Sequence, residues 1–161
     1  MSTPGTMPTP EDLTNCSRQT WMAVLSQASS DQLASRMAML DPLPSYRCLR
    51  PPETGLTMVR GRAGGTGQVF NLGEMTLTRC VVVMGEEPDA VTGFGYVAGR
   101  DKQQAERVAV CDALLQQDSW QAVLLQQVIA PLQQLAANYR ATVERQTAAT
   151  QVDFFTMLRG E

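Results

Sequence analysis

Glycine and arginine residues are concentrated in one stretch that could bind an anion, ETGLTMVRGRAGGTGQVFNLGEMTLTR, which runs from Glu53 to Arg79. Strand side chains repeat every two residues, so we expect Arg60 and Arg62 on one face of the strand that enters the loop. Backbone N–H groups of a glycine-rich turn can form a nest for phosphate oxygens. A tight turn that needs positive φ would explain the same glycines without a ligand. Both interpretations stay open.

The loop does not match the common nucleotide-binding patterns. A Walker loop ends in Gly-Lys-Ser/Thr and leads into a helix, whereas here Gln68 leads into a strand-like segment. The dinucleotide pattern G-x-G-x-x-G is also absent from this loop. Arg100 and Lys102 lie near an expected helix start, where each side chain either faces an anion or lies on the solvated surface. The candidate ligand-binding residues are therefore Arg60, Arg62, Gly64, Gly65, Thr66, Gly67, Arg100 and Lys102.

Composition excludes several kinds of active site. The 161 residues include no histidine, which removes Ser-His and Cys-His nucleophilic sites and most zinc sites. The four cysteines show no C-x-x-C spacing, so we expect reduced, mostly buried thiols. Glu106 and Asp112 are six residues apart on an expected helix and do not share a face as an acid/base pair would. We predict no catalytic residue, metal site or cofactor in this chain.

Net charge and hydropathy indicate whether the protein binds nucleic acid or enters a membrane. A formal net charge of −3 argues against nonspecific nucleic-acid binding, which depends on clustered lysine and arginine. The start of the chain lacks a basic region followed by an apolar run, and no window approaches 18 apolar residues. We therefore expect a cytoplasmic protein without a membrane span.

The pattern of apolar residues predicts an α+β fold with an antiparallel meander sheet of three to four strands, an N-terminal helical hairpin and C-terminal helices. We expect residues 1–8 to be a disordered leader and residues 9–161 to form a single domain. Within that domain, the expected parts are a helical hairpin at 9–41, a sheet at 54–98, helices at 101–150 and a docking tail at 152–161.

Capping signals place the ends of the helices. Thr9 and Pro10 predict the start of a first helix that ends near Gln27, and Ser29 with Gln32 forms a capping box for the second. Asp101 and Gln104 form a second capping box, for a helix that runs to about residue 116. Further helices are expected at 120–128 and beyond Pro131, which opens or kinks the last one.

Alternation and glycine place the strands. Segments 54–62, 69–72, 75–84 and 91–98 are expected to be strands, with Gly73 as a break. The preceding segment from Tyr46 to Arg50 lies between prolines and suits an extended edge piece but hardly a central strand. Glycines at 93 and 95 fall on one face of the last strand, and the following helix has a small-residue face suited to lying flat on a sheet.

The C-terminal segment is apolar and follows the point where the domain should be complete. It is interpreted either as the final packed turn of the domain or as a docking element for another chain, and the second is preferred because exposed apolar segments mark interaction sites. The candidate interface residues are Val152, Phe154, Phe155, Met157 and Leu158.

Several blocks together resemble one family, the PhnG proteins, which are the G subunits of the bacterial carbon–phosphorus (C–P) lyase system. The matching blocks are RQTWMAVLSQA (18–28), the glycine-containing stretch (53–79), GYVAGRDKQQAERVAVCDALLQ (95–116) and VDFFTMLRGE (152–161). The resemblance is specific because these blocks fall in order along the chain, and no catalytic residue is carried over from it.

The resemblance implies a cytosolic subunit of a complex that also contains the H, I and J proteins and allows phosphonates to serve as a phosphorus source. The associated step displaces adenine from ATP with methylphosphonate and forms α-D-ribose 1-methylphosphonate 5-triphosphate. ATP would be a substrate of the complex, and the I subunit resembles the catalytic partner. The alternatives are a structural scaffold without ligand contact and a stand-alone nucleotide-binding enzyme, the latter of which would bind ATP in isolation.

Overall fold

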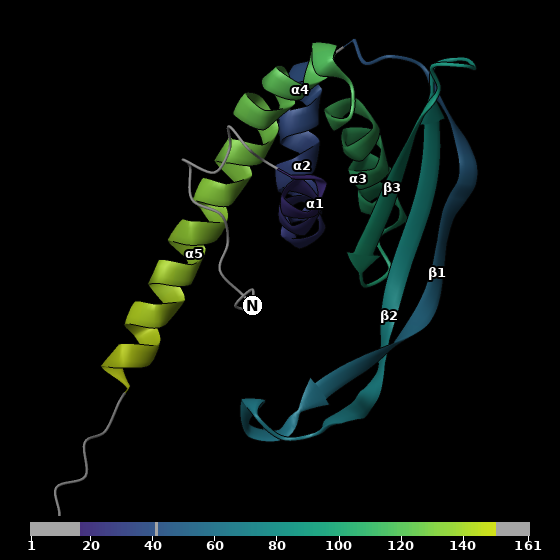
Figure 1. Cartoon of the computed structure of the whole chain (residues 1–161). Coiled ribbons are helices and arrows are strands. Elements are labelled where there is room, and N and C mark those ends of the chain that lie inside the picture. The colour runs from purple at the N-terminus through teal and green to yellow at the C-terminus, as the bar shows by residue number, and fades with distance from the viewer. Residues whose placement is uncertain (1–16, 41, 151–161) are drawn as a thin grey trace, which may run out of the picture.

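The computed structural model describes residues 17–40 and 42–150 and shows an α+β fold with helices on one face of a three-stranded antiparallel sheet (Figure 1). The strand order is β1-β2-β3, as expected for a meander. The elements are α1 (Arg18–Gln27), α2 (Ser30–Met37), η2 (Ala38–Leu40), β1 (Tyr46–Arg62), η3 (Ala63–Gly65), β2 (Val69–Met84), β3 (Val91–Ala98), α3 (Lys102–Leu115), α4 (Asp118–Leu124), η4 (Leu125–Ile129) and α5 (Ala130–Ala149).

The sheet is longer than the sequence predicts. β1 begins at Tyr46 rather than at residue 54, and it passes Pro51 and Pro52 through two register shifts against β2. Proline is tolerated there because β1 is an edge strand. On its free edge, the N–H that proline lacks would not have bonded to a neighbouring strand. The expected break at Gly73 is wrong, because β2 runs through it with a register shift where Val59 pairs with Gly73 and Arg60 with Asn71.

Close packing between α3 and β3 forms the centre of the core. Gly93 and Gly95 face the helix, and a Cβ added to Gly95 would overlap the carbonyl oxygen of Ala105 and lie 2.9 Å from the nitrogen of Ala109. Only glycine allows the helix backbone to approach the strand this closely. The expected small-residue face of this helix is therefore confirmed, and all residues from Val108 to Leu115 are buried.

The helix boundaries confirm some capping signals and correct others. The Ser29–Gln32 capping box is present, whereas only half of the one at Asp101 forms, because the Gln104 side chain donates to the carbonyl of Ala28 instead. α1 begins at Arg18, so a continuous helix from residue 9 to 27 is wrong; residues 9–16 lie outside the described residues. The leader (1–8) and the tail (152–161) also lie outside them.

The C-terminal helices form one continuous rod rather than two separate helices. α4 starts at Asp118, and the π-helical turn η4 connects it directly to α5, which holds Pro131 in its first turn. Proline is tolerated at that position because the π-helical turn before it already interrupts the regular α-helical hydrogen bonds, so the missing N–H costs little. α5 then extends well beyond the other helices (Figure 1). Among the described residues, no helix is long and apolar enough to cross a membrane.

Candidate functional site

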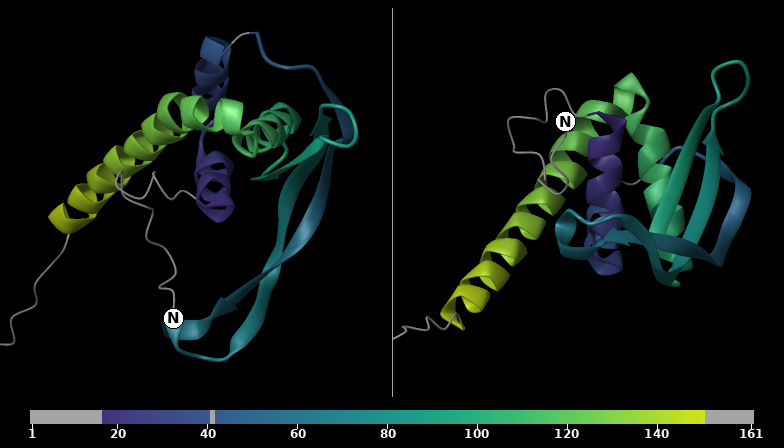
Figure 2. Two further views of the ribbon diagram at one scale, coloured as in Figure 1. Left: turned by 45° about the horizontal axis from the view of Figure 1, so that its top comes forward. Right: turned by 60° about the horizontal axis from the view of Figure 1, so that its bottom comes forward.

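The glycine-rich loop lies at the tip of a long projection, which we call the arm and define as residues 54–76 of the β1–β2 hairpin. β3 pairs with β2 only from Leu77 onward, so the arm is a two-stranded ribbon beyond the three-stranded part of the sheet. In Figure 1 the arm and α5 both extend below the part of the molecule where the other helices pack on the sheet, and the left view of Figure 2 shows the arm reaching away from the helices. The candidate anion loop is therefore held away from the core rather than in a pocket of it.

The loop geometry supports the turn interpretation of its glycines. Gly64 and Gly65 have φ values of 59° and 77°, a conformation that side-chain-bearing residues rarely adopt. The Gly67 N–H donates to the carbonyl of Ala63 at 3.0 Å, and the guanidinium of Arg62 donates to the carbonyl of Gly67 at 3.2 Å. Arg62 thus helps to close the turn.

The register keeps Arg60 and Arg62 on one face of the arm, as predicted, because they pair with Asn71 and Val69 in the ladder. Both arginines are exposed, and neither takes part in the ion pairs found among the described residues. The tip therefore presents two positive charges that an anion or an acidic surface can approach.

The structure does not bring all the predicted anion-binding residues together. Arg100 and Lys102 lie at the root of the arm, since the neighbouring Gly99 N–H donates to the carbonyl of Thr76 at 2.9 Å. Val69, at the tip end of β2, precedes Thr76 by seven residues, which corresponds to roughly 23 Å at about 3.3 Å per residue. The eight candidates thus form two groups, one at the tip and one at the root.

The arm also carries large apolar side chains that the core does not cover. Leu56 and Leu72 are 67% and 66% exposed, although they belong to regular strands. Opposed residues share a face, so Leu56 and Met58 continue the sheet face that α3 covers at Thr78 and Cys80. The remaining exposed apolar residues of the arm are Val69, Phe70 and Met75.

A two-stranded ribbon with both edges free is marginally stable in water, and exposed apolar surface of this kind marks an interaction site. Sequence reasoning missed this surface because the alternation in 54–62 looks like that of a half-buried strand. The arm is therefore a surface suited to another protein chain.

A buried carboxylate, which sequence reasoning dismissed as an acid/base group, holds α1, α3 and β3 together. Asp112 is 0% exposed and accepts from Trp21 Nε1 at 3.0 Å and from the Phe94 N–H at 2.9 Å. Arg18 donates to both of its oxygens, through Nε at 3.1 Å and Nη2 at 2.6 Å. Such complete satisfaction by donors from two elements, α1 and β3, indicates a structural role.

The buried thiols are not set up for nucleophilic chemistry. Burial raises the pKa of Cys80 to about 12 and that of Cys111 to about 12, so both stay protonated near neutral pH. Cys48 is exposed, so two of the three cysteines among the described residues are buried, in line with the expectation of mostly buried thiols. Burial, together with the hydrogen bond from Tyr46 to Glu106, also raises the pKa of the Tyr46 hydroxyl to about 12. Within the described residues, no group of three or more His, Cys, Asp or Glu residues could hold a metal ion.

Comparison with known proteins assigns the family. The family described as phosphonate metabolism protein PhnG matches residues 16–160. The chain belongs to the PhnG family. A PhnG protein from Rhizobium meliloti (strain 1021), named alpha-D-ribose 1-methylphosphonate 5-triphosphate synthase subunit PhnG, is 40% identical over 156 residues. That alignment covers 95% of this chain and 96% of the relative, so the arm, α5 and the C-terminal segment all fall in the part shared with PhnG proteins.

Proposed function

We propose that this chain is a subunit of alpha-D-ribose 1-methylphosphonate 5-triphosphate synthase and acts in organic phosphonate catabolism. In this proposal, the complex transfers ribose 5-triphosphate from ATP to methylphosphonate and releases adenine. The observation that carries the proposal is the 40% identity to the R. meliloti synthase subunit over nearly the full length of both chains. ATP is a substrate of the complex, and this chain needs no cofactor of its own.

The shape of the chain supports a subunit rather than an independent enzyme. The arm exposes apolar residues on a ribbon that a partner would stabilise, and the buried thiols of Cys80 and Cys111 are protonated near neutral pH. The partners in this proposal are the H, I and J chains of the C–P lyase core complex, in the cytoplasm. The I chain supplies the catalytic groups, and this chain binds through its arm.

We further propose that Arg60 and Arg62 stabilise the anionic triphosphate or phosphonate once the complex has assembled. Their guanidinium groups share one face of the arm, at a tip that carries no ion pair in the described part of the chain. Arginine forms forked, charge-assisted hydrogen bonds with phosphate oxygens. The alternative is a scaffold whose tip touches only protein.

Replacing both Arg60 and Arg62 with alanine is expected to reduce adenine release by the reconstituted synthase at least about tenfold, while the partner chains still co-purify. A hydrogen bond to a charged group contributes about 1.5–3 kcal/mol, and about 1.4 kcal/mol corresponds to tenfold in rate. The measurement is chromatographic quantification of adenine released from ATP in the presence of methylphosphonate.

The matched control removes two exposed arginines elsewhere, Arg47 in β1 and Arg145 in α5, so that the loss of net charge is the same. This control should retain both assembly and turnover. Normal turnover in the Arg60/Arg62 double variant would favour the scaffold. Loss of co-purification would show instead that the tip binds a partner rather than the substrate.

A further inference from the structure

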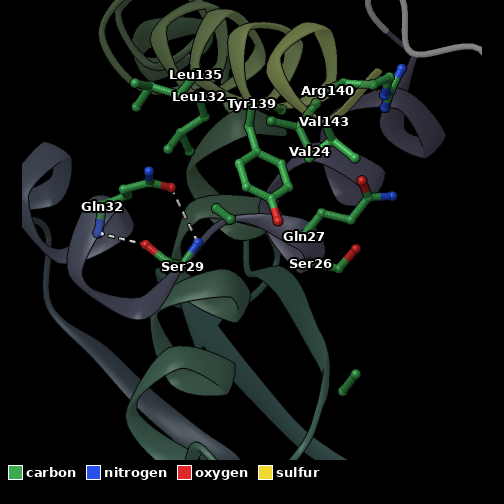
Figure 3. A pocket seen from close by; sticks show the side chains of 13 residues that line it. Val24, Ser26, Gln27, Ser29, Gln32, Leu132, Leu135, Tyr139, Arg140 and Val143 are labelled. Carbon is green, nitrogen blue, oxygen red and sulfur yellow. Dashed lines mark hydrogen bonds between the residues drawn. The ribbon is translucent and has the colours of Figure 1, made fainter. Parts of the chain in front are cut away.

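A groove of about 730 Å³ lies between the middle of α5 and the joint of α1 and α2. Figure 3 shows Tyr139 pointing from α5 toward Gln27 and Ser29, with Leu132, Leu135 and Val143 along the same helix. The opposite wall is fixed, because Ser29 and Gln32 form the capping box that starts α2. The groove is therefore an apolar strip facing a rigid polar wall.

The strip on α5 is a helical face without a cover among the described residues. Leu132, Leu135, Tyr139 and Val143 follow at intervals of three and four residues, which places them on one side of the helix. Leu132 is buried, but Tyr139 is 74% exposed. An aromatic side chain left this exposed in the middle of an apolar face indicates a surface that another segment covers.

The groove continues toward the end of α5. A second hollow of about 550 Å³ is lined by Val143, Thr147, Ala148 and Thr150, and it shares Val143 with the first. The two hollows therefore form one track along α5, from Thr150 back to Leu132. A segment entering at Thr150 would follow this track without crossing the helix.

The length of the chain beyond Thr150 fits this track. An α-helix rises about 1.5 Å per residue, so Tyr139 lies about 16 Å before Thr150, whereas an extended chain advances about 3.3 Å per residue and brings Phe155 to the same height. By the same arithmetic, residue 153 reaches Val143 and residue 157 reaches Leu135. The apolar residues of the segment thus fall opposite the apolar residues of α5.

Charge and proximity favour the same occupant. Arg140 lines the groove, and Asp153 is the acidic residue of the apolar segment. A segment tethered to the helix that it covers also has a high effective concentration, which a separate chain lacks. The groove therefore suits this chain's own C-terminal segment better than a free peptide.

We propose that residues 152–158 fold back antiparallel to α5 and fill this groove. Phe155 packs beside Tyr139, Met157 beside Leu135, and the Asp153 carboxylate pairs with the Arg140 guanidinium. This assigns the segment to the chain's own fold, in place of the preferred interpretation as a docking element for another chain. The inference is independent of the proposed enzymatic role, because it concerns the chain in isolation.

Disulfide trapping in the full chain tests this arrangement. Tyr139→Cys is combined with Phe155→Cys in a background with Cys16 and Cys48 replaced by serine, and copper–phenanthroline serves as the oxidant. The matched control is Ala141→Cys with Phe155→Cys, because residue 141 is exposed on the opposite side of α5, about 3 Å along its axis from residue 139. The first pair removes the Tyr139 ring, which the proposal makes a contact of the segment. A second pair, Val143→Cys with Asp153→Cys, therefore tests the same arrangement with Tyr139 in place.

We expect an intrachain disulfide in both groove pairs, with a yield at least about fivefold above the control, as measured by peptide mass spectrometry under non-reducing conditions. Equal yields in groove and control pairs would overturn the proposal. It would also be overturned by a disulfide that forms only between chains, which would indicate a second copy in the groove. A disulfide that forms in neither groove pair would contradict it as well.

Discussion

Gly95→Ala is expected to destabilise the protein by at least about 3 kcal/mol, because the added methyl group would overlap backbone rather than a movable side chain. The new Cβ would meet the carbonyl of Ala105 and lie 2.9 Å from the Ala109 nitrogen. Overpacking a core costs typically 1–3 kcal/mol, and α3 can yield only by moving away from β3 as a unit. The measurement is the free energy of unfolding from urea denaturation followed by circular dichroism.

Gly55→Ala provides the matched control, because Gly55 lies in β1 of the same sheet and a Cβ there meets nothing within 4 Å. That variant should be neutral or slightly stabilising, since alanine reduces the conformational entropy of the unfolded chain. Equal effects of the two substitutions would contradict the close α3–β3 packing.

Asp112→Ala is the second substitution with a large expected effect, a loss of about 3 kcal/mol. It leaves Trp21 Nε1 and the Phe94 N–H without their acceptor, and Trp21 is itself buried. An unsatisfied buried donor costs about 1–3 kcal/mol. Arg18 adds less to the loss, because its side chain is 45% exposed and can be solvated again.

Glu144→Ala is the control for Asp112→Ala, since Glu144 is an exposed acid on α5, and its loss should change stability by no more than about 0.5 kcal/mol. The same denaturation measurement applies to both variants. If Asp112→Ala folds with wild-type stability, the hydrogen bonds to this carboxylate do not hold α1 and β3 on α3.

Local chemistry predicted much of the fold. The capping box at Ser29 and the N-cap at Asp101 are short-range hydrogen bonds, and both are present. The shared face of Gly93 and Gly95 follows from the two-residue repeat of a strand, and it matches the small-residue face of α3. Features that depend only on residues a few positions away in the sequence could therefore be predicted.

Features that depend on residues far apart in the sequence could not be predicted. Asp112 meets Trp21 and Phe94, which are 91 and 18 residues away, so its donors could not be identified from spacing. Alternation predicted the strand that enters the arm, but it cannot show whether a helix covers a strand along its full length. The candidate cations fall into a tip group and a root group because β3 pairs with β2 only from Leu77 onward, which sets the length of the two-stranded arm. The sequence does not show where that pairing ends.

Adenine release by the synthase, assembled from the H, I and J chains with and without this chain, tests the central claim most directly. Both mixtures receive ATP and methylphosphonate, and the amount of adenine is followed by chromatography. We expect release at the full rate only when this chain is present, with omission lowering it at least about tenfold. An unchanged rate of adenine release in its absence would contradict its role as a required subunit.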